Sequence, residues 1–574
     1  MKEKQVWNLS LVGSGGDGVM TTANMLLKTA ARTGLYGMMT QSYGPQIRGG
    51  EAAAHVTIGV DPVTMVDRKK DWIVCFRFAD AVRFEKEMEA AKNTVVIHAA
   101  EETEIPAMFA KAKGKNIPIP FLKVLQEAGL SELAKNVFLF GILVRALGWK
   151  EEDGKACVAE MFSRKSSAVV SSNIRAFELG LHYMEQFTGP AKIFKPKSGV
   201  SRPVMTGNEA CALASVAAGC RFYAGYPITP SSEILEEMNE LLPKAGGKLI
   251  QAEDEISALG MVIGASYGGV PSMTATSGPG LSLMTEMLGL SGIAEIPLVV
   301  VDCQRAGPST GMPSRMEQSD FWHAVFGGHG DFPRVVLAPT DVRDCYQTMF
   351  RAFYCAENFQ LPVIVLSDAN IAQRAEVIDP VDTDSFEKPK RLNWTDGPQG
   401  YRRFGLDALI SPMAFPGTAG GIHCIAGIEH SEKGMPSSDG AMHEAMNQKR
   451  FRKWEALSET AVGWHRHYGP PKAPHVLIAW GSSAAVAREF AESHPDFAVF
   501  VPLILHPFPK KALQHFLKNR KTVSVLEMNY QGQFYHYLKG IGAIDGNAQS
   551  FKRSGGQPFH IEELGQMIQE GGIL

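Results

Sequence analysis

Short apolar runs alternate with amphipathic stretches along most of this chain. In the first third, the runs 6–12, 52–58 and 72–76 have the length and composition of strands, and 19–32 has the period of an amphipathic helix. Strands and helices in alternation are typical of α/β domains with mainly parallel sheets. We therefore predict an α/β domain over residues 1–188.

The same alternation returns in the middle and at the end of the chain. Two further α/β domains are predicted, at 204–377 and 473–574. Their predicted strands lie at 221–224, 272–275, 298–301, 335–337 and 363–366, and at 476–479, 500–503 and 522–527.

Two stretches lack this periodicity. Residues 189–203 are rich in Lys, Pro and Ser and are predicted to form a linker. Residues 378–472 carry many Pro, Gly and charged residues, with one helix predicted at 442–456. Because a loop of this length is seldom without a role, we expect it to wrap other domains or a partner.

Composition narrows the class of protein. The chain has 574 residues, 45% hydrophobic and 20% charged, with a net charge of −3, which is ordinary for a globular protein and gives no reason to expect nucleic acid or a membrane surface. No C-x-x-C occurs among the 8 cysteines, so we predict buried thiols and no metal ligands. No apolar run reaches membrane-spanning length, and the N-terminus is too polar for a signal peptide. We therefore expect a cytoplasmic protein.

Candidate chemistry begins in the segment 226–233. Pro227 and Pro230 remove backbone donors and form a stiff turn, after which Ser231 or Ser232 can cap a helix beginning near residue 233. Thr229 and the free amide groups would then face the carboxylate of a small acid. Taken alone, the segment is more typical of a proline-rich turn with a helix cap.

Two later segments point to the same site. Glu255 is the last of three acids at 253–255 and runs directly into the small apolar helix predicted at 259–266, where its carboxylate would be partly desolvated. Residues 274–280 predict a strand that opens into a loop of small residues. Gly278 in that loop would allow close approach of a ligand or another backbone.

The order of these segments resembles the pyrimidine-binding domain of the 2-oxoacid:ferredoxin oxidoreductases, which are thiamine-diphosphate enzymes. Further matching motifs follow at 304–311, 317–320, 327–331 and 338–340. Residues 1–188 are similar to the family's gamma domain, and 473–574 to its transketolase C-terminal-like domain. The chain as a whole is similar to fused gamma-alpha subunits of the 2-oxoglutarate type.

The resemblance implies roles for particular residues. Glu255 would hydrogen-bond the aminopyrimidine of thiamine diphosphate and act in catalysis, with Glu253 as the alternative. Arg305 follows a predicted strand, where ligands gather in parallel sheets, and would bind the substrate carboxylate; Arg315 could meet a second carboxylate or be a solvated loop charge. The implied substrate-binding residues are Thr229, Arg305, Tyr226, Pro227 and Ile228, and the implied cofactor-binding residues are Glu255, Thr276, Ser277 and Gly278.

A glycine-rich loop at residues 13–18 satisfies the dinucleotide fingerprint G-x-G-x-x-G, but 38–43 lacks the acid that the fingerprint needs on the next strand. The resemblance instead places a phosphate-bearing group there, such as coenzyme A. A tight turn with nothing bound explains the pattern equally well. The residues that would bind coenzyme A are Gly13, Gly15, Gly16, Gly18 and Arg48.

The family's diphosphate–metal motif, GDG followed by an Asn a helix and loop later, has no match after Gly16–Gly18, since Asn24 is too close. The resemblance therefore implies a beta subunit that carries the diphosphate and Mg²⁺ site and a 4Fe–4S cluster, in a dimer of heterodimers. The missing motif also argues against a transketolase-type enzyme that would bind thiamine diphosphate without a partner subunit.

The implied reaction converts a 2-oxoacid, 2-oxoglutarate in this subgroup, and coenzyme A to acyl-CoA, carbon dioxide and reduced ferredoxin, or runs in reverse. Specificity for pyruvate or a branched-chain 2-oxoacid is one alternative. A non-catalytic nucleotide-binding subunit built on residues 13–18 is another.

Overall fold

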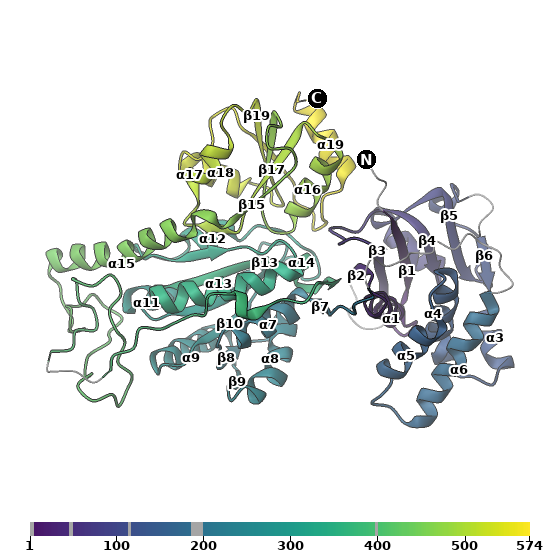
Figure 1. Ribbon diagram of the computed structural model, residues 1–574, viewed down its shortest axis with the longest axis horizontal. Coiled ribbons are helices and arrows are strands. Elements are labelled where there is room, and N and C mark those ends of the chain that lie inside the picture. Colours follow the sequence, from purple (N-terminus) through teal and green to yellow (C-terminus); the bar gives the residue numbers. More distant parts are fainter. Residues whose placement is uncertain (1–4, 45–49, 113–115, 185–198, 396–399, 574) are drawn as a thin grey trace. The chain divides into compact units, whose positions relative to one another are not determined.

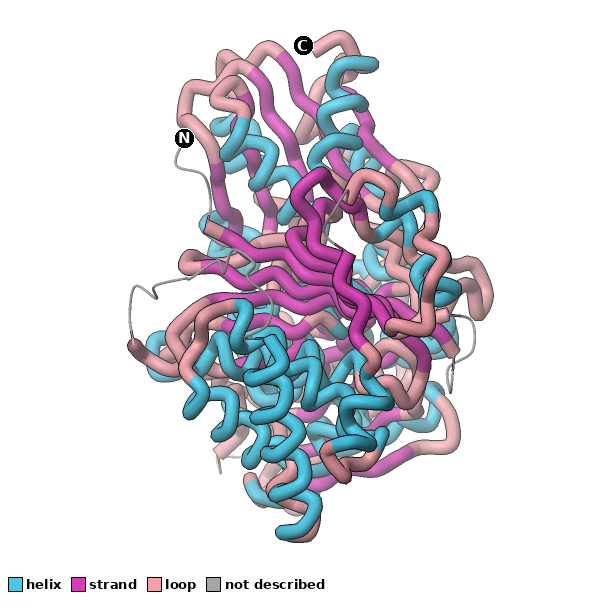
Figure 2. Tube along the Cα trace, turned by 90° about the vertical axis from the view of Figure 1, so that its right-hand side faces the viewer, coloured by secondary structure: helices cyan, strands magenta, loops and turns pink. Residues whose placement is uncertain are grey.

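A computed structural model describes residues 5–44, 50–112, 116–184, 199–395 and 400–573 (Figures 1 and 2). The chain divides into two compact units. The first unit comprises Met1–Thr206 and Gln373–Pro380, and the second comprises Gly207–Ala372 and Val381–Leu574. The α/β class predicted from the sequence is confirmed in both units.

The first unit is built on an 8-stranded sheet in the order β6-β5-β4-β1-β3-β2-β14-β7. Strands β6, β5, β4 and β1 pair in parallel, whereas β1, β3, β2, β14 and β7 pair antiparallel. The strands are β1 Val6–Ser14, β2 Tyr36–Tyr43, β3 Glu51–Gly59, β4 Lys69–Cys75, β5 Glu89–Ala99, β6 Asn116–Ile119, β7 Val204–Thr206 and β14 Ala375–Val377.

Helices cover this sheet, and the largest core cluster lies between them and the strands. Leu26 of α1, Phe138 of α4 and Leu9 of β1 all belong to this cluster and are fully buried. The helices are α1 Val19–Arg32, α2 Phe78–Arg83, α3 Phe121–Glu127, α4 Lys135–Ala146, α5 Glu151–Met161 and α6 Ser167–Met184.

The second unit contains a 7-stranded sheet in the order β18-β12-β13-β11-β10-β8-β9, parallel except at the β12–β18 edge. The strands are β8 Phe222–Gly225, β9 Lys248–Gln251, β10 Ser272–Thr276, β11 Leu298–Gln304, β12 Val335–Leu337, β13 Pro362–Asp368 and β18 Ile504–His506. The helices are α7 Gly207–Ala217, α8 Ser232–Lys244, α9 Glu255–Tyr267, α10 Gly278–Leu283, α11 Thr285–Ala294, α12 Phe321–Phe326, α13 Val342–Phe359 and α14 Ala369–Gln373.

A 5-stranded sheet in the order β15-β17-β16-β19-β20 completes the second unit, parallel except between β15 and β17. Its core is continuous with that of the larger sheet, because Val300 and Trp480 share one cluster. The strands are β15 His465–Tyr468, β16 His475–Ala479, β17 Phe497–Pro502, β19 Thr522–Glu527 and β20 Gln549–Lys552, with helices α16 Ser483–Ser493, α17 Lys510–Phe516, α18 Gln533–Gly540 and α19 Ile561–Glu570.

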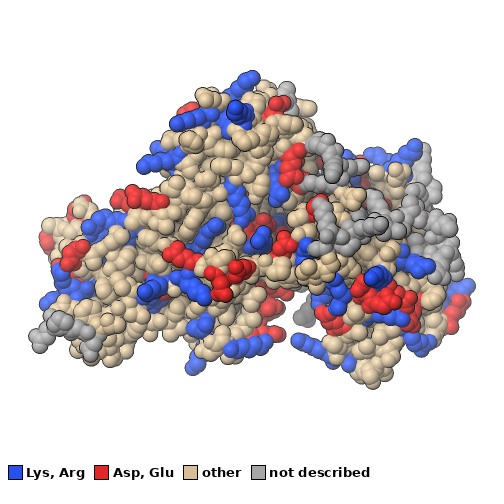
Figure 3. Space-filling view, in the orientation of Figure 1, with Lys and Arg blue, Asp and Glu red and all other residues tan. Residues whose placement is uncertain are grey.

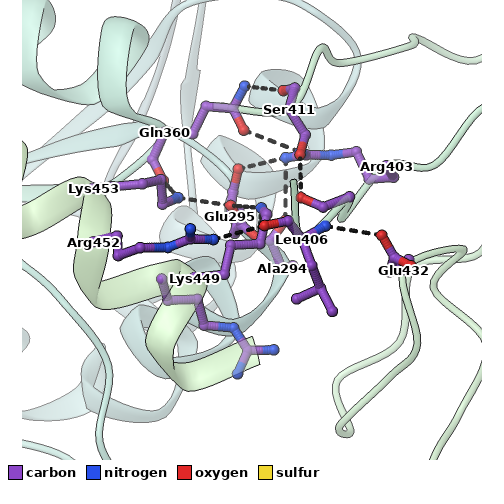
Figure 4. A network of polar contacts seen from close by, with 12 residues as sticks. Ala294, Glu295, Gln360, Arg403, Leu406, Ser411, Glu432, Lys449, Arg452 and Lys453 are labelled. Atoms are coloured by element: carbon purple, nitrogen blue, oxygen red, sulfur yellow. Dashed lines mark hydrogen bonds and ion pairs between the residues drawn. The ribbon is translucent and has the colours of Figure 1, made fainter. Parts of the chain in front are cut away.

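The long connecting segment is held on the second unit by buried charge. It contains helix α15, Gly440–Thr460, which confirms the helix predicted at 442–456, and β15 of the smaller sheet follows before its predicted end at residue 472. Lys449 and Lys453 of α15 reach Glu295, the residue that terminates α11, and none of the three side chains is exposed (Figure 4). Arg403 from the irregular part of the segment donates to the Glu295 carbonyl at 2.7 Å. The segment therefore packs on the α11 side of the domain.

Three sequence-based expectations need correction or restriction. The edges of the predicted 204–377 domain, β7 and β14, pair with each other and β14 pairs with β2, so both lie in the sheet of the first unit. The predicted linker at 189–203 lies mostly outside the described residues. The expectation that all cysteines are buried is wrong at Cys424, which is exposed.

Surface properties agree with the modest net charge. Basic and acidic side chains are interspersed on the face drawn in Figure 3. Among the described residues, no helix is both long and apolar enough to cross a membrane.

Candidate active site

The turn between β8 and α8 has mostly exposed residues. Tyr226, Pro227 and Thr229 are exposed, and Ile228 is partly buried. The predicted side-chain cap is wrong, however: Ser231 occupies the N-cap position but its hydroxyl donates to the Ile228 carbonyl at 2.9 Å, inside the turn. The turn is thus stiffened from within.

Arg305 joins this turn to the end of β11. Its side chain is 6% exposed, and Nη1 donates to the Thr229 carbonyl oxygen at 2.6 Å. Nε is buried without a hydrogen-bond partner among the described residues. The structure therefore brings together the two residues predicted to bind a carboxylate, and it leaves a guanidinium donor unsatisfied beside them.

Glu255 is the first residue of α9 and is 5% exposed. The N-cap role belongs to its neighbour, because Asp254 accepts the Ser257 N–H at 2.7 Å in a capping box. Glu253 is exposed. Of the three adjacent acids, only Glu255 is buried, which is the environment expected of a group that exchanges protons with a bound ring.

The residues 276–280 form a helix start rather than the predicted loop. Strand β10 ends at Thr276, and α10 begins at Gly278. A Cβ added to Gly280 would come within 2.0 Å of Thr276 Oγ1 and 2.6 Å of Glu255 Oε1, so only glycine permits this approach. The Ser277 hydroxyl is buried with no partner within the described part of the chain. Glu255, Thr276 and Ser277 therefore surround one glycine-lined turn.

Two acids that were not singled out from the sequence complete the site. Asp302, near the end of β11, is 0% exposed, and Asp320, just before α12, is partly buried. A Cβ on Gly278 would lie 2.8 Å from Asp320 Oδ2. Asp320 therefore reaches the same turn of α10 that Glu255 approaches. An acid at the carboxyl end of an apolar strand is a signal that could have drawn attention to Asp302.

Burial changes the protonation of this acid pair. Desolvation raises the pKa of Asp302 well above its usual value, and the neighbouring Asp320 raises it further, while Arg305 opposes both. Desolvation likewise raises the pKa of Asp320, to about 6. Burial therefore favours the protonated form of both carboxyl groups.

Comparisons with known proteins show which family the chain is similar to. Residues 213–449 match the family model described as pyruvate flavodoxin/ferredoxin oxidoreductase, thiamine diphosphate-binding, and residues 8–183 match the model described as pyruvate ferredoxin/flavodoxin oxidoreductase. The 2-oxoglutarate synthase subunit KorA of Methanothermobacter marburgensis is 37% identical over 62% of this chain and 96% of its own length. The alpha subunit of a Sulfolobus 2-oxoacid:ferredoxin oxidoreductase is 29% identical over 97% of this chain and 95% of its own.

A solved structure extends the likeness to the whole fold. The 2-oxoglutarate:ferredoxin oxidoreductase of Magnetococcus marinus, with 2-oxoglutarate, coenzyme A and succinyl-CoA bound, superposes with a TM-score of 0.92 at 33% identity, covering 99% of this chain and 100% of that one. The chain belongs to the 2-oxoacid:ferredoxin oxidoreductases. It is a subunit of a thiamine-diphosphate-dependent enzyme of that family.

The glycine-rich loop of this oxidoreductase subunit lies in the first unit. Gly16 and Gly18 have positive φ. A Cβ added to Gly13 would lie 2.7 Å from Asp17 Oδ2, so the Asp17 carboxylate packs against this glycine. Asp17 accepts the Ser14 N–H at 2.6 Å and pairs with Lys135. The Asp17 carboxylate already occupies the Ser14 N–H and the Lys135 ammonium, so these two donors are not available to a phosphate. The other predicted contributor, Arg48, lies outside the described residues.

Proposed function

We propose that this chain supplies the pyrimidine side of the thiamine-diphosphate site in an enzyme that converts 2-oxoglutarate and coenzyme A to acyl-CoA, carbon dioxide and reduced ferredoxin, or carries out the reverse reaction. The observation that carries this proposal is the turn of α10, which Glu255 approaches from one side and Asp320 from the other. Arg305 donates a hydrogen bond to the Thr229 carbonyl and is influenced electrostatically by Asp302 and Asp320. Its guanidinium provides the anion site.

The described residues fit the pyrimidine end of thiamine diphosphate. The glycines at 278 and 280 let Asp320, Thr276 and Glu255 come close to the turn of α10, and the unpartnered Ser277 hydroxyl is available to a ring beside them. Thiamine diphosphate supplies, when bound, the electron sink that decarboxylation of a 2-oxoacid requires. Glu255, Thr276, Ser277 and Gly278 are the residues that would hold it from this chain.

Glu255 is the proposed proton-exchanging residue. Its carboxylate lies at the buried start of α9, where water competes little for hydrogen bonds. From there Oε1 can accept and return a proton from a ring nitrogen placed over Gly280. The exposed Glu253 lacks this environment.

Arg305 and Thr229 are the proposed substrate ligands. A guanidinium can bind a carboxylate through two parallel N–H donors, and the unsatisfied Nε of Arg305 provides one of them. Its Nη1 bond to the Thr229 carbonyl fixes the guanidinium against the turn. Tyr226, Pro227 and Ile228 would then line the approach to the carboxylate. The names of the relatives favour 2-oxoglutarate over pyruvate or a branched-chain acid as substrate.

A beta subunit is proposed as the partner. Relatives of this chain are named as subunits, and the chain lacks the GDG–Asn motif for a diphosphate-bound metal. We place the diphosphate, Mg²⁺ and a 4Fe–4S cluster in that subunit, with ferredoxin as the electron acceptor and a dimer of heterodimers as the assembly. Reduced thiols throughout the described cysteines suit the cytoplasm as the proposed location.

The proposal is tested with the enzyme assembled from both subunits. Glu255→Gln should lower turnover of 2-oxoglutarate by roughly 10²–10⁴-fold, the range typical of acid–base groups, while the melting temperature stays close to that of the wild type. Glu253→Gln is the matched control and should retain turnover. Wild-type rates for Glu255→Gln, or reduction of a viologen dye by this chain alone, would contradict the proposal.

A further inference from the structure

Two consecutive backbone carbonyls of the turn between β8 and α8 are held by side chains from distant parts of the chain. The Thr229 carbonyl accepts Nη1 of Arg305 at 2.6 Å. The next carbonyl, that of Pro230, accepts Nδ2 of Asn208 at 2.7 Å. Asn208 is the second residue of α7 and has no role in the substrate binding proposed above.

The side chain of Asn208 is 1% exposed, and its amide has partners on both sides. Nδ2 also donates to Glu233 Oε2 at 3.0 Å, and Oδ1 accepts the thiol of Cys303, with 3.5 Å between Sγ and Oδ1. A primary amide carries two N–H donors and an oxygen acceptor, whereas an ionised carboxylate can only accept. The two oxygen acceptors on one side and the thiol on the other therefore suit asparagine and not aspartate.

These hydrogen bonds form a closed circuit between the two segments that carry the proposed substrate ligands. Cys303 belongs to β11, and Arg305 directly follows that strand. Arg305 donates to the Thr229 carbonyl. Cys303 donates to Asn208, which donates in turn to the Pro230 carbonyl. Because the circuit passes through the strand end, α7 and the turn, a shift of any one of them breaks a hydrogen bond.

Burial makes the bond from Asn208 to Pro230 hard to replace. Pro230 is buried, whereas Thr229 beside it is exposed. A buried carbonyl that loses its donor is unfavourable unless water reaches it. Without the Asn208 amide, the turn would therefore move toward water, and it would carry Thr229 away from Arg305.

We propose that Asn208 is a positioning residue for substrate binding: by holding the Pro230 carbonyl, it fixes the turn where Thr229 and Arg305 receive the carboxylate of the 2-oxoacid together. This inference rests on the proposed role of Arg305 and Thr229 as substrate ligands. Asn208 is buried and acts through the turn. Its effect falls on binding of the 2-oxoacid, and not on turnover or on coenzyme A.

Two variants of the assembled enzyme test this role. Asn208→Ala should raise KM for 2-oxoglutarate by about tenfold, as expected when a buried carbonyl loses its donor, with kcat and KM for coenzyme A within about twofold of the wild type. Asn208→Leu removes the amide while filling the same volume, and it should have the same effect. Ser215→Ala is the matched control and should change none of these values, because Ser215 is equally buried on α7 but its hydroxyl donates to the Cys211 carbonyl inside the helix.

A double-mutant cycle tests whether Asn208 acts through the arginine site. In the Arg305→Ala enzyme, Asn208→Ala should raise KM further by less than about twofold, because the ligand that the turn positions is already absent. Hydrogen exchange of residues 226–233 gives a second readout that needs no substrate. Exchange there should be faster in Asn208→Ala than in the wild type or Ser215→Ala.

Four results would overturn the proposal: an unchanged KM for 2-oxoglutarate or a fall confined to kcat in both Asn208 variants, an effect that multiplies fully with that of Arg305→Ala, unchanged exchange of residues 226–233, or loss of the folded enzyme in both variants. The last result would show that Asn208 serves the fold alone. Failure of the proposed substrate site would appear differently, as an unchanged KM for 2-oxoglutarate in Arg305→Ala itself.

Discussion

Two buried charge clusters in the second unit are built in opposite ways. At Glu295, one acid is surrounded by cations, and both of its oxygens are bonded by Lys449 at 2.7 Å. At Asp302 and Asp320, two acids are influenced electrostatically by one cation, Arg305, and most of their oxygens receive no donor from the described residues. In the first cluster the acid oxygens already have hydrogen-bond donors, whereas in the second cluster several acid oxygens could still accept a hydrogen bond from another group.

The pKa of each acid follows from this difference. Burial tends to raise the pKa of Glu295, but Lys449 and Lys453 outweigh it and hold the pKa well below its usual range. Burial raises the pKa of Asp302, and its acidic neighbour adds to the rise. A cluster with excess cations therefore stays charged and acts in stability, and a cluster with excess acid retains a proton that ligand binding can influence.

Their places in the fold explain the contrast. Glu295 ends α11 and Gln360 ends α13, and Arg403 and Lys453 donate to the carbonyl or side-chain oxygens of these two residues. Helix C-termini favour cations, so this cluster anchors the connecting segment. Asp302 instead lies at the carboxyl end of a parallel strand, where α/β proteins bind their ligands.

The largest effect on stability is expected at the complete cluster. Glu295→Ala would leave Lys449, Lys453 and Arg403 buried without their acid, which should lower the free energy of unfolding by about 3–5 kcal/mol. Thermal or denaturant unfolding of the assembled enzyme measures this change. Glu286→Ala, at an exposed acid on the same helix α11, is the control and should have little effect. Equal stability of the two variants would contradict the structural role of the cluster.

At the incomplete cluster, the expected effect falls on binding rather than on stability. Arg305→Ala should raise KM for the 2-oxoacid by an amount equivalent to about 2–5 kcal/mol, as expected for truncation of one partner of a buried charge pair. Asp302 and Asp320 can compensate by protonation, so the melting temperature should change less than for Glu295→Ala. Thr229→Ala should act in the same direction but by about 0.5–1.5 kcal/mol.

Steady-state kinetics of the assembled enzyme show whether Arg305 binds the 2-oxoacid or coenzyme A. An increase in KM for coenzyme A in place of the 2-oxoacid would place Arg305 on the thioester side. Arg343→Ala, at an exposed residue of α13, should leave both KM values unchanged.

The smallest effect is expected at a third acid of the connecting segment, Glu429. Burial alone would raise its pKa, but hydrogen bonds from Arg450 and His443 lower it from 4.5 to about 2. Because the folded-state pKa is depressed, the stabilisation is present above pH 4.5 and is lost as the pH falls through about 2. Glu429→Gln should therefore lower the free energy of unfolding above pH 4.5. It should also reduce the loss of stability between pH 4.5 and about 2.

The control for this acid transition lies on α15. Glu444→Gln, at an exposed residue, should leave the acid unfolding curve unchanged. An acid transition in Glu429→Gln that coincides with the wild type would show that the ion pair with Arg450 contributes nothing to the docking of the segment.

The local pattern of the sequence was sufficient for most regular elements and for the main catalytic candidate. Strands such as β11 are buried throughout and begin with an apolar run, and α1 spans the predicted residues Val19–Arg32, because burial on a sheet imposes these periods on the sequence. Glu255 was found because its charge is adjacent to an apolar helix. The order of short motifs then identified the family, since each motif is local and keeps its place along the chain.

Tertiary structure alone decided which distant residues meet. Glu295 and Lys449 are 154 positions apart, and nothing in either local sequence indicates the other. Asp302 and Asp320 likewise influence each other only when the chain between β11 and α12 folds back, and residues 204–206 and 375–377 become neighbours only through a shared sheet. Sequence periodicity reports which face of an element is buried, whereas the partner on that face depends on how all the elements pack together. For this reason the sequence sufficed to propose the family and Glu255, and the acid pair behind Arg305 required the folded chain.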